Sequence, residues 1–241
     1  MKLSIIVPHF NEENNLEIFC KNFIDKNLIE NYEIVFVDDY STDKTKILTN
    51  KLHKSYQNFI FLNNNETKGL GGAIRTGIKN STGDLIAIMM CDSSDSVEDL
   101  QNYYDLSIDG NYDAILGSRF IEGSKIFNYP KKKLILNRVF NYLVKILFLS
   151  DYNDFTNAFK IYKKKTLISI FPLVSENFNI FLEMPLKIIY RNFNYKIISI
   201  SWSNKRIGES NFKIRELGSK YFFTLLYCFF EKILIVGNKK K

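Results

Sequence analysis

Short apolar runs alternate with amphipathic stretches along the first half of the chain. The amphipathic stretch from Leu16 to Ile24, for example, repeats its apolar residues at the spacing of one helix face. Strands that alternate with helices predict βαβ units and an α/β fold with a mainly parallel sheet flanked by helices. Five runs have the continuous apolarity of strands buried on both faces: 3–7, 33–37, 59–62, 85–90 and 113–116.

The pattern changes after Gly123. The segment 221–230 contains no charged residue, and lysines end the chain. We therefore predict one α/β domain over residues 1–212, followed over residues 213–241 by an apolar C-terminal helix that lies at an interface. The elements predicted in between are a basic loop at 124–133, an apolar helix at 134–149, and strands at 157–162 and 195–201.

The composition excludes several classes of protein. With 241 residues, 46% of them hydrophobic and 15% aromatic, the chain has enough apolar surface to fold rather than stay disordered. Its 3 cysteines form no CxxC pair, which argues against a cysteine zinc site and favours a reducing compartment. The apolar run before Pro8 is too short for a signal peptide. We expect the chain on the cytoplasmic side of the membrane, as a peripheral protein.

The net charge of +7 favours polyanionic partners, such as nucleic acid, anionic lipid or phosphorylated substrates. The sequence lacks the interleaved aromatic and basic residues of a nucleic-acid groove, so we expect no nucleic acid as partner. It also lacks the signature of a P-loop. The remaining partners are a membrane surface and phosphorylated small molecules.

Polar and acidic residues follow four of the predicted strands. Open parallel sheets bind their ligands outside the carboxyl ends of the strands. Each loop alone also has a structural interpretation: Asp39 could cap a helix, and the glycines at 69–72 could form a close-packing turn. Four such loops at one edge nevertheless predict a binding site, and they are 8–12, 38–43, 91–95 and 117–119.

Asp92 stands directly after an apolar strand. A carboxylate placed there needs a cation or hydrogen-bond donors to offset its desolvation. Carboxylate and hydroxyl oxygens suit Mg²⁺ or Mn²⁺ that bridges a diphosphate. The alternative role for Asp92 is that of an N-cap for a helix starting near Ser96.

Taken together, these loops resemble those of family 2 glycosyltransferases with the GT-A fold. Within that family they are most similar to the polyprenyl-phosphate sugar transferases typified by dolichol-phosphate mannosyltransferase. The resemblance extends from Ser4 to about Phe212. It rests on the order and spacing of the segments SIIVPHFNEE, VFVDDYSTDKT, NNNETKGLGGAIRTGI, STGDLIAIMMCDSSDSVEDL, AILGSRFIEG, NDFTNAFKIYKK and NKRIGESNF.

The resemblance implies a nucleotide-diphosphate sugar donor, a divalent cation and inverting transfer. It places the base of the donor at Asp39 and the cation at Asp92, with Ser94 or Asp95 completing the metal ligands. The implied nucleotide-sugar-binding residues are Pro8, Phe10, Glu12, Val37, Asp39, Cys91, Asp92, Ser94, Arg119, Arg206 and Ser210. The implied catalytic residues are Asp92, Arg119, Asp154, Glu183 and Arg206, of which Asp154 and Glu183 could serve as bases for a hydroxyl acceptor.

The chain departs from the family pattern at several positions. Met90 replaces the first aspartate of the DxD metal motif, Asn157 replaces a usual glycine and Lys160 a usual arginine. The QxxRW signature of processive synthases is missing, which favours the transfer of one sugar per encounter. The resemblance predicts transfer to a polyprenyl phosphate for cell-envelope glycans or glycolipids. The alternatives are transfer to a saccharide hydroxyl in surface-polysaccharide assembly, and an inactive nucleotide-binding protein.

Overall fold

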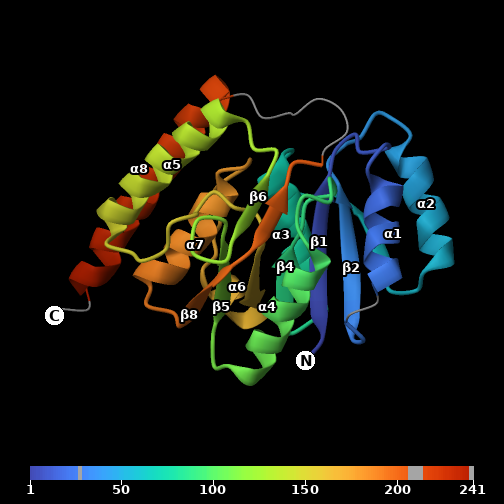
Figure 1. The fold of residues 1–241 in the computed structure, drawn as a ribbon, viewed down its shortest axis with the longest axis horizontal. Coiled ribbons are helices and arrows are strands. Elements are labelled where there is room, and N and C mark those ends of the chain that lie inside the picture. Colours follow the sequence, from blue (N-terminus) through green and yellow to red (C-terminus); the bar gives the residue numbers. More distant parts are fainter. Residues whose placement is uncertain (27–28, 206–213, 239–241) are drawn as a thin grey trace.

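The computed structural model describes residues 1–26, 29–205 and 214–238 (Figure 1). A seven-stranded sheet lies at its centre, with the order β3-β2-β1-β4-β7-β5-β8, and a two-stranded sheet pairs β6 with β9. The strands are β1 (Leu3–His9), β2 (Tyr32–Asp38), β3 (Phe59–Asn63), β4 (Leu85–Ile88), β5 (Ala114–Ser118), β6 (Lys125–Phe127), β7 (Lys160–Lys163), β8 (Tyr195–Ser199) and β9 (Ser201–Ser203).

The large sheet is parallel except for one strand. β7 runs antiparallel to β4 on one side and to β5 on the other, while β1, β2, β3 and β4 pair in parallel and β5 pairs in parallel with β8. The prediction of a mainly parallel α/β sheet is therefore confirmed. The first five predicted strands match β1 to β5 within two residues at each end.

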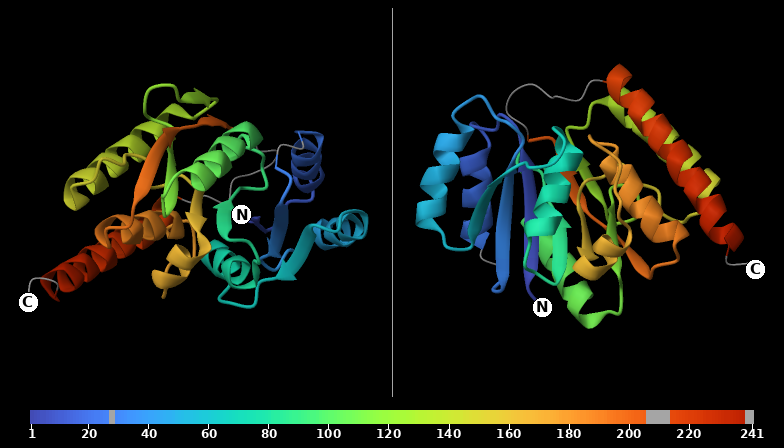
Figure 2. Two further views of the ribbon diagram at one scale, coloured as in Figure 1. Left: turned by 90° about the horizontal axis from the view of Figure 1, so that it is seen from below. Right: turned by 180° about the vertical axis from the view of Figure 1, so that it is seen from behind.

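Helices cover both faces of the sheet (Figures 1 and 2). One core lies under α1, α2 and α4, and a second lies under α3, α5, α6, α7 and α8. The bounds of the helices are α1 (Leu16–Lys26), α2 (Thr45–Ser55), α3 (Leu70–Asn80), α4 (Val97–Asp109), α5 (Lys131–Phe148), α6 (Lys164–Ser169), α7 (Ile180–Tyr190) and α8 (Ile214–Asn238).

The glycine-rich segment at the start of α3 allows close packing of the backbone. A Cβ on Gly71 would come within 2.0 Å of the Ser175 carbonyl oxygen, and Gly69 has φ +129° with the Glu176 carbonyl behind it. Only glycine allows the backbone to approach this closely with that dihedral. The predicted close-packing turn is confirmed.

The C-terminal third differs from its sequence prediction in the two segments described next. The basic loop 124–133 contains β6 and the first turn of α5, which begins at Lys131. The strand expected at 195–201 is two strands, β8 and β9, separated by Ile200. Because β9 pairs with β6 instead of continuing the large sheet, the chain leaves the sheet at this point.

The helix α8 packs against the domain that precedes it. Glu231 accepts a hydrogen bond from the Tyr190 hydroxyl at 2.7 Å, pairs with Arg191, and lies 3.7 Å from the Lys187 ammonium. Tyr221 and Cys228 are buried in the same core as α3 and α7, so the described part of the predicted segment 213–241 has an inner side in that core. Within the described residues, the helices fall short of the combined length and apolarity that a bilayer-spanning segment needs.

Candidate active site

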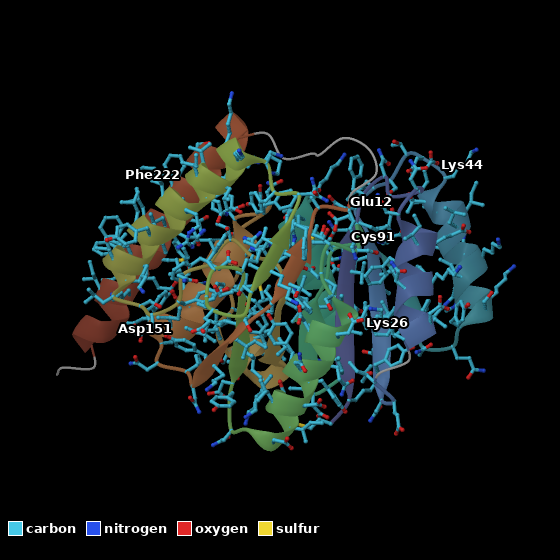
Figure 3. The ribbon with its side chains drawn as sticks, viewed as in Figure 1. Glu12, Lys26, Lys44, Cys91, Asp151 and Phe222 are labelled. Atoms are coloured by element: carbon cyan, nitrogen blue, oxygen red, sulfur yellow. The ribbon has the colours of Figure 1, made fainter. Side chains whose placement is uncertain are left out.

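The four loops singled out in the sequence meet at one edge of the sheet. β1, β2 and β4 are parallel neighbours, and β5 points the same way because β7 is antiparallel to both β4 and β5. Their carboxyl ends therefore face one side. Figure 3 shows Glu12, after β1, and Cys91, after β4, at this upper rim. The predicted clustering of the loops is confirmed.

Three of these loops contain a strained backbone. Asn11, Tyr40 and Ser93 follow β1, β2 and β4, and have φ of 53°, 63° and 55°. Residues other than glycine rarely adopt this left-handed region, and such residues concentrate at functional sites. The strain therefore marks the same rim that the acidic residues mark.

Asp39 is held at the rim by two hydrogen bonds. Its Oδ1 accepts from Asn64 Nδ2 at 2.8 Å and from the Gly69 amide at 2.9 Å, and the residue is 8% exposed. Asn64 and Gly69 come from the turn before α3, so that turn orients the carboxylate. Phe10, one loop away, is half-buried.

Other residues expected to line the nucleoside lie deeper. Val37 and Cys91 are buried in the two cores on either side of the sheet, and Pro8 is buried within β1. The Glu12 carboxylate accepts a hydrogen bond from Asn15 at 2.6 Å and is also buried. These four residues therefore lie beneath the rim. A ligand bound above the strand ends would contact the side chains of Phe10 and Asp39 before it reached them.

Two carboxylates stand together after β4. The Asp92 Oδ1 accepts from the Ser94 amide at 3.0 Å, and Asp95 Oδ2 accepts from the Met90 amide at 3.4 Å. Burial and then the neighbouring charge of Asp92 raise the pKa of Asp95 to about 7. Asp95 therefore gives a second carboxylate to the loop in which Met90 stands at the position of the first DxD aspartate.

The loop fits a divalent cation in its donor chemistry. The hydroxyl oxygens of Ser93 and Ser94 are buried without a hydrogen-bond partner, next to the Asp92 carboxylate. Orphaned hydroxyls are costly unless something binds them, and hard oxygen donors suit Mg²⁺ or Mn²⁺. The described residues nevertheless contain no group of three His, Cys, Asp or Glu side chains placed to hold a metal. A cation here would need ligands from the substrate as well.

Arg119 and Asp154 form a buried bidentate ion pair. Nε lies 2.8 Å from Oδ2 and Nη2 lies 2.7 Å from Oδ1, while the Arg119 amide also donates to Oδ2 at 2.9 Å. Burial opposes the charge of Arg119, but the Asp154 carboxylate outweighs it and raises the pKa of the guanidinium. Asp154 is fully buried. It is therefore occupied by three hydrogen bonds rather than free to act as a base.

Aromatic rings surround this pair. The Arg119 guanidinium lies 5.4 Å from the Phe120 ring centroid, 5.6 Å from that of Tyr129 and 5.7 Å from that of Trp202. Trp202 comes from β9 and also forms an isolated antiparallel bridge with Asp95, in the loop that carries Asp92. A lone tryptophan at the end of a strand carries no sequence signal beyond core packing, so Trp202 could not be assigned to the site from the sequence.

Arg138 on α5 is a second guanidinium at the site that sequence reasoning missed. It lies 4.2 Å from the Phe120 ring centroid, and its Nη1 donates to the Asn153 carbonyl oxygen at 3.1 Å. Asn153 directly precedes Asp154, so the part of α5 that carries Arg138 lies beside the ion pair. A lone arginine in an apolar helix gave no sequence signal of this role.

The departures at Asn157 and Lys160 have structural reasons. Asn157 Nδ2 donates to the Gly117 carbonyl at 3.2 Å and to the Phe159 carbonyl at 3.1 Å, which ties the loop to the end of β5. Lys160 is buried, and its ammonium donates to the Phe155 carbonyl at 3.3 Å and to that of Asn157. Burial lowers the pKa of Lys160 to about 7.

Glu183 is not placed to act as a base. It is fully buried in α7, where its two oxygens accept from the amides of Val174 and Ser175 at 3.0 and 2.8 Å. Its carboxylate also lies 3.0 Å from the Lys187 ammonium. These contacts hold the loop before α7, so we drop Glu183 from the predicted catalytic residues. Arg206 and Ser210 lie outside the described residues.

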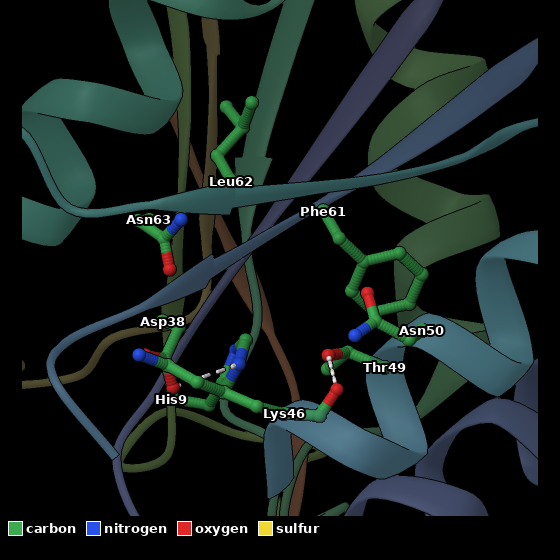
Figure 4. A pocket seen from close by; sticks show the side chains of 8 residues that line it. All are labelled: His9, Asp38, Lys46, Thr49, Asn50, Phe61, Leu62 and Asn63. Carbon is green, nitrogen blue, oxygen red and sulfur yellow. Dashed lines mark hydrogen bonds and ion pairs between the residues drawn. The ribbon is translucent and has the colours of Figure 1, made fainter.

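A hollow of about 270 Å³ lies beside the rim, toward α2 (Figure 4). His9 Nε2 and Asp38 Oδ1 are 3.6 Å apart there, and Lys46 lies 3.6 Å from the other Asp38 oxygen. Burial lowers the pKa of His9. Phe10 and Asp39 are not among the residues that line the hollow, which are His9, Asp38, Lys46, Thr49, Asn50, Phe61, Leu62 and Asn63.

The fold and the acidic rim define a class of enzyme, the glycosyltransferases with the GT-A fold. Glucosyl-3-phosphoglycerate synthase from Mycobacterium tuberculosis has the same fold, with a TM-score of 0.71 and 15% identity over 94% of this chain and 79% of that one. A complex of that enzyme with Mn²⁺, UDP and glucosyl-3-phosphoglycerate gives a TM-score of 0.68 over the same shares of the two chains, again at 15% identity.

The chain belongs to glycosyl transferase family 2, whose model matches residues 4–171. Dolichol-phosphate mannosyltransferase from Pyrococcus furiosus is 32% identical over 138 residues, which are 57% of this chain and 39% of that protein. Polyprenol monophosphomannose synthase from Mycolicibacterium smegmatis is 24% identical over 230 residues, 89% of this chain and 86% of that protein. The chain is a glycosyltransferase, and the resemblance seen in its motifs is confirmed.

Proposed function

We propose that the chain transfers a sugar, with inversion, from a nucleotide-diphosphate donor to a polyprenyl phosphate. The choice of a phosphate rather than a hydroxyl as acceptor rests on one observation. Both carboxylates that the sequence offered as bases, Asp154 and Glu183, are buried and fully engaged. A sugar hydroxyl needs a base to accept its proton, whereas a phosphomonoester has a second pKa of about 6 and attacks as the anion it already is.

The acceptor phosphate requires cations rather than a base. Arg138 is the candidate, because its contacts with a carbonyl oxygen and a ring leave guanidinium donors for phosphate oxygens. Arg119 contributes less directly, since Asp154 holds one edge of its guanidinium. Arg206 stays a sequence-based candidate for the same task.

The donor diphosphate belongs at the Asp92 loop. Asp92, Asp95 and the Ser94 hydroxyl would hold Mg²⁺ or Mn²⁺ together with phosphate oxygens of the donor. A divalent cation bound there stabilises the negative charge that develops on a leaving diphosphate. Two relatives of the chain, a dolichol-phosphate mannosyltransferase and a polyprenol monophosphomannose synthase, support a polyprenyl phosphate as the acceptor.

The outer faces of α5 and α8 support action at a membrane surface. The two helices lie together along one side of the molecule (Figures 1 and 2), where Phe140 contacts Tyr221 and Phe148 contacts Phe229. α5 carries lysines and an arginine but no acidic residue. Exposed apolar residues together with basic ones suit the interface of an anionic bilayer. We propose that the protein binds the cytoplasmic side of the membrane in this way. The exposed apolar residues are Ile135, Leu136, Val139, Tyr142, Leu143, Ile146, Leu147, Leu149, Phe222, Phe223, Phe230, Ile233 and Leu234.

Acidic residues introduced on this face should release the protein from membranes. The double variant Leu136→Glu, Leu143→Glu replaces two residues that are more than half exposed. Its affinity for anionic liposomes should fall tenfold or more, because burying one leucine side chain is worth roughly 1.5–3 kcal/mol. Co-sedimentation measures this. Ile47→Glu, at a residue 69% exposed on α2, is the matched control and should bind as the unaltered protein does. Equal loss in both variants would remove the assignment of this face.

A transfer assay tests the proposed reaction. The purified protein is given a panel of nucleotide-diphosphate sugars with Mn²⁺ or Mg²⁺, and either a polyprenyl phosphate or a saccharide acceptor. We expect a glycosylated lipid phosphate with at least one donor, and no product with the saccharide. Product on the saccharide alone would overturn the lipid assignment, and the absence of both transfer and donor hydrolysis would indicate an inactive protein.

A further inference from the structure

Three polar side chains form a row across the ends of three neighbouring strands. His9, Asp38 and Asn63 are register partners in β1, β2 and β3, and all three line the hollow beside α2 (Figure 4). Val7 and Phe36, two residues earlier in β1 and β2, belong to the core under α1, α2 and α4. Because side chains alternate along a strand, the row lies on that same face, away from α3 and the turn before it.

The His9 ring presents a nitrogen lone pair to the hollow. Its Nδ1 lies 3.3 Å from the Val7 carbonyl oxygen, which can only accept a hydrogen bond, so Nδ1 carries the proton. In the neutral ring Nε2 then has the lone pair, and burial lowers the pKa of His9, which favours that neutral form. Nε2 is buried and has no hydrogen-bond partner in the part of the chain that the structure describes. A donor or a cation at Nε2 would remove the cost of leaving this acceptor unpaired.

Asp38 supplies a second ligand at a suitable distance. Its Oδ1 lies 3.6 Å from His9 Nε2 (Figure 4). Two bare acceptors at that distance repel each other, whereas bonds of about 2.1 Å to one tetrahedral ion would set them about 3.4 Å apart. The Ser41 amide donates to both Asp38 oxygens, at 3.4 and 3.2 Å, and so orients the carboxylate. A histidine that donates its other N–H to a backbone carbonyl, beside a hydrogen-bonded carboxylate, is the usual environment of metal ligands.

The mixed nitrogen and oxygen donors decide which ion fits. Imidazole suits Zn²⁺ and other late transition metals, whereas Mg²⁺ prefers oxygen ligands throughout. Lys46 opposes a cation, because its ammonium lies 3.6 Å from Asp38 Oδ2, the oxygen that does not face His9. The Lys46 side chain is 53% exposed, however, and can turn into solvent. The pair therefore favours Zn²⁺ over Mg²⁺, in contrast to the oxygen donors of the Asp92 loop.

We propose that His9 Nε2 and Asp38 Oδ1 bind a transition-metal ion such as Zn²⁺, with the Asn63 amide oxygen and water completing its ligands. The site is separate from the cation proposed at the donor diphosphate, and it does not depend on the proposed function. Each of the two main ligands directly precedes a residue of the rim, Phe10 or Asp39. A bound ion therefore ties the ends of β1 and β2 together beneath the rim and stabilises it.

Metal titration of the tag-free protein tests the site, with Zn²⁺ or Co²⁺ added in the presence of excess Mg²⁺. We expect one ion per chain, the visible absorption of tetrahedral Co²⁺, and an unfolding midpoint raised by about 5 °C or more when free Zn²⁺ is a hundredfold above its dissociation constant. His9→Gln should weaken this binding at least a hundredfold, and Asp38→Asn at least tenfold. His53→Gln is the matched control, because His53 is the other histidine of the chain and its Nδ1 likewise contacts a carbonyl oxygen, that of Phe59 at 2.9 Å. It should bind as the unaltered protein does.

Nitrogen-15 NMR of the two histidine rings identifies the ligand atom without any substitution. Zn²⁺ should shift the Nε2 resonance of His9 and leave both ring nitrogens of His53 in place. This readout decides the question even where His9→Gln does not fold. Absence of Zn²⁺ and Co²⁺ binding, unweakened binding by folded His9→Gln, or an unmoved His9 resonance would each overturn the site. The transfer assay is independent of all three outcomes, so the proposed function can fail or stand separately.

Discussion

Asp92→Ala should lower sugar transfer about a thousandfold and leave the fold intact. Asp92 is only half-buried, and its carboxylate accepts a hydrogen bond from the Ser94 amide in its own loop. Removing the side chain therefore removes little packing. It does remove the carboxylate placed to hold the cation at the donor diphosphate. Losing one preorganised group that stabilises transition-state charge typically costs 10²–10³ in rate. Initial rates at saturating donor and Mn²⁺, with circular dichroism on the same sample, measure both effects.

The matched control for this variant is Asp25→Ala, an exposed carboxylate on α1 far along the chain from the rim. It should keep full activity. A variant Asp92→Ala that turns over at the normal rate would remove the metal assignment, whatever the reaction proves to be. Loss of activity together with loss of the native spectrum would instead make Asp92 a structural residue.

Asp154→Ala should destabilise the protein by about 3–5 kcal/mol, because it leaves the Arg119 guanidinium buried without its counter-charge. Arg119 also loses the carboxylate that fixes its orientation among the aromatic rings. Urea denaturation followed by fluorescence measures the change in the free energy of unfolding. Asp151→Ala, three residues earlier and exposed (Figure 3), is the control and should stay within about 0.5 kcal/mol of the parent.

A double variant distinguishes a lost ion pair from general damage to the loop. Asp154→Leu with Arg119→Met replaces both charges by apolar side chains, and such replacements are often neutral or stabilising. The double variant should regain most of the stability lost in Asp154→Ala. It should not transfer sugar, because it lacks the Arg119 guanidinium. A double variant as unstable as the single one would show that the charge pair is not the cause.

The strands and their rim could be predicted because their signals are local. The run Ile34–Val37 is apolar throughout, and that pattern alone indicates a strand covered on both faces. Parallel pairing then places Asp39 and Asp92 at the same edge without knowledge of any tertiary contact. The motif resemblance added the roles of these residues.

What could not be predicted depends on contacts between distant residues. Arg119 and Asp154 are 35 positions apart, and no local pattern tells that one fully engages the other. Glu183 looked like a free acid because the amides that bind it belong to a loop with no regular structure. Trp202 reaches the site only because β9 lies outside the large sheet, and Arg138 only because the middle of α5 packs beside the ion pair.

The reversed direction of β7 has a consequence for how the site is divided. An antiparallel strand brings its beginning, not its end, to the edge where its neighbours finish, so the loop that carries Asp154 rises between the Asp92 loop and Arg119. It also holds β4 and β5 two strand spacings apart, about 10 Å. The strand that leads into the proposed donor loop, β4, and the strand that leads into Arg119, β5, thus belong to two separate parallel blocks of the sheet.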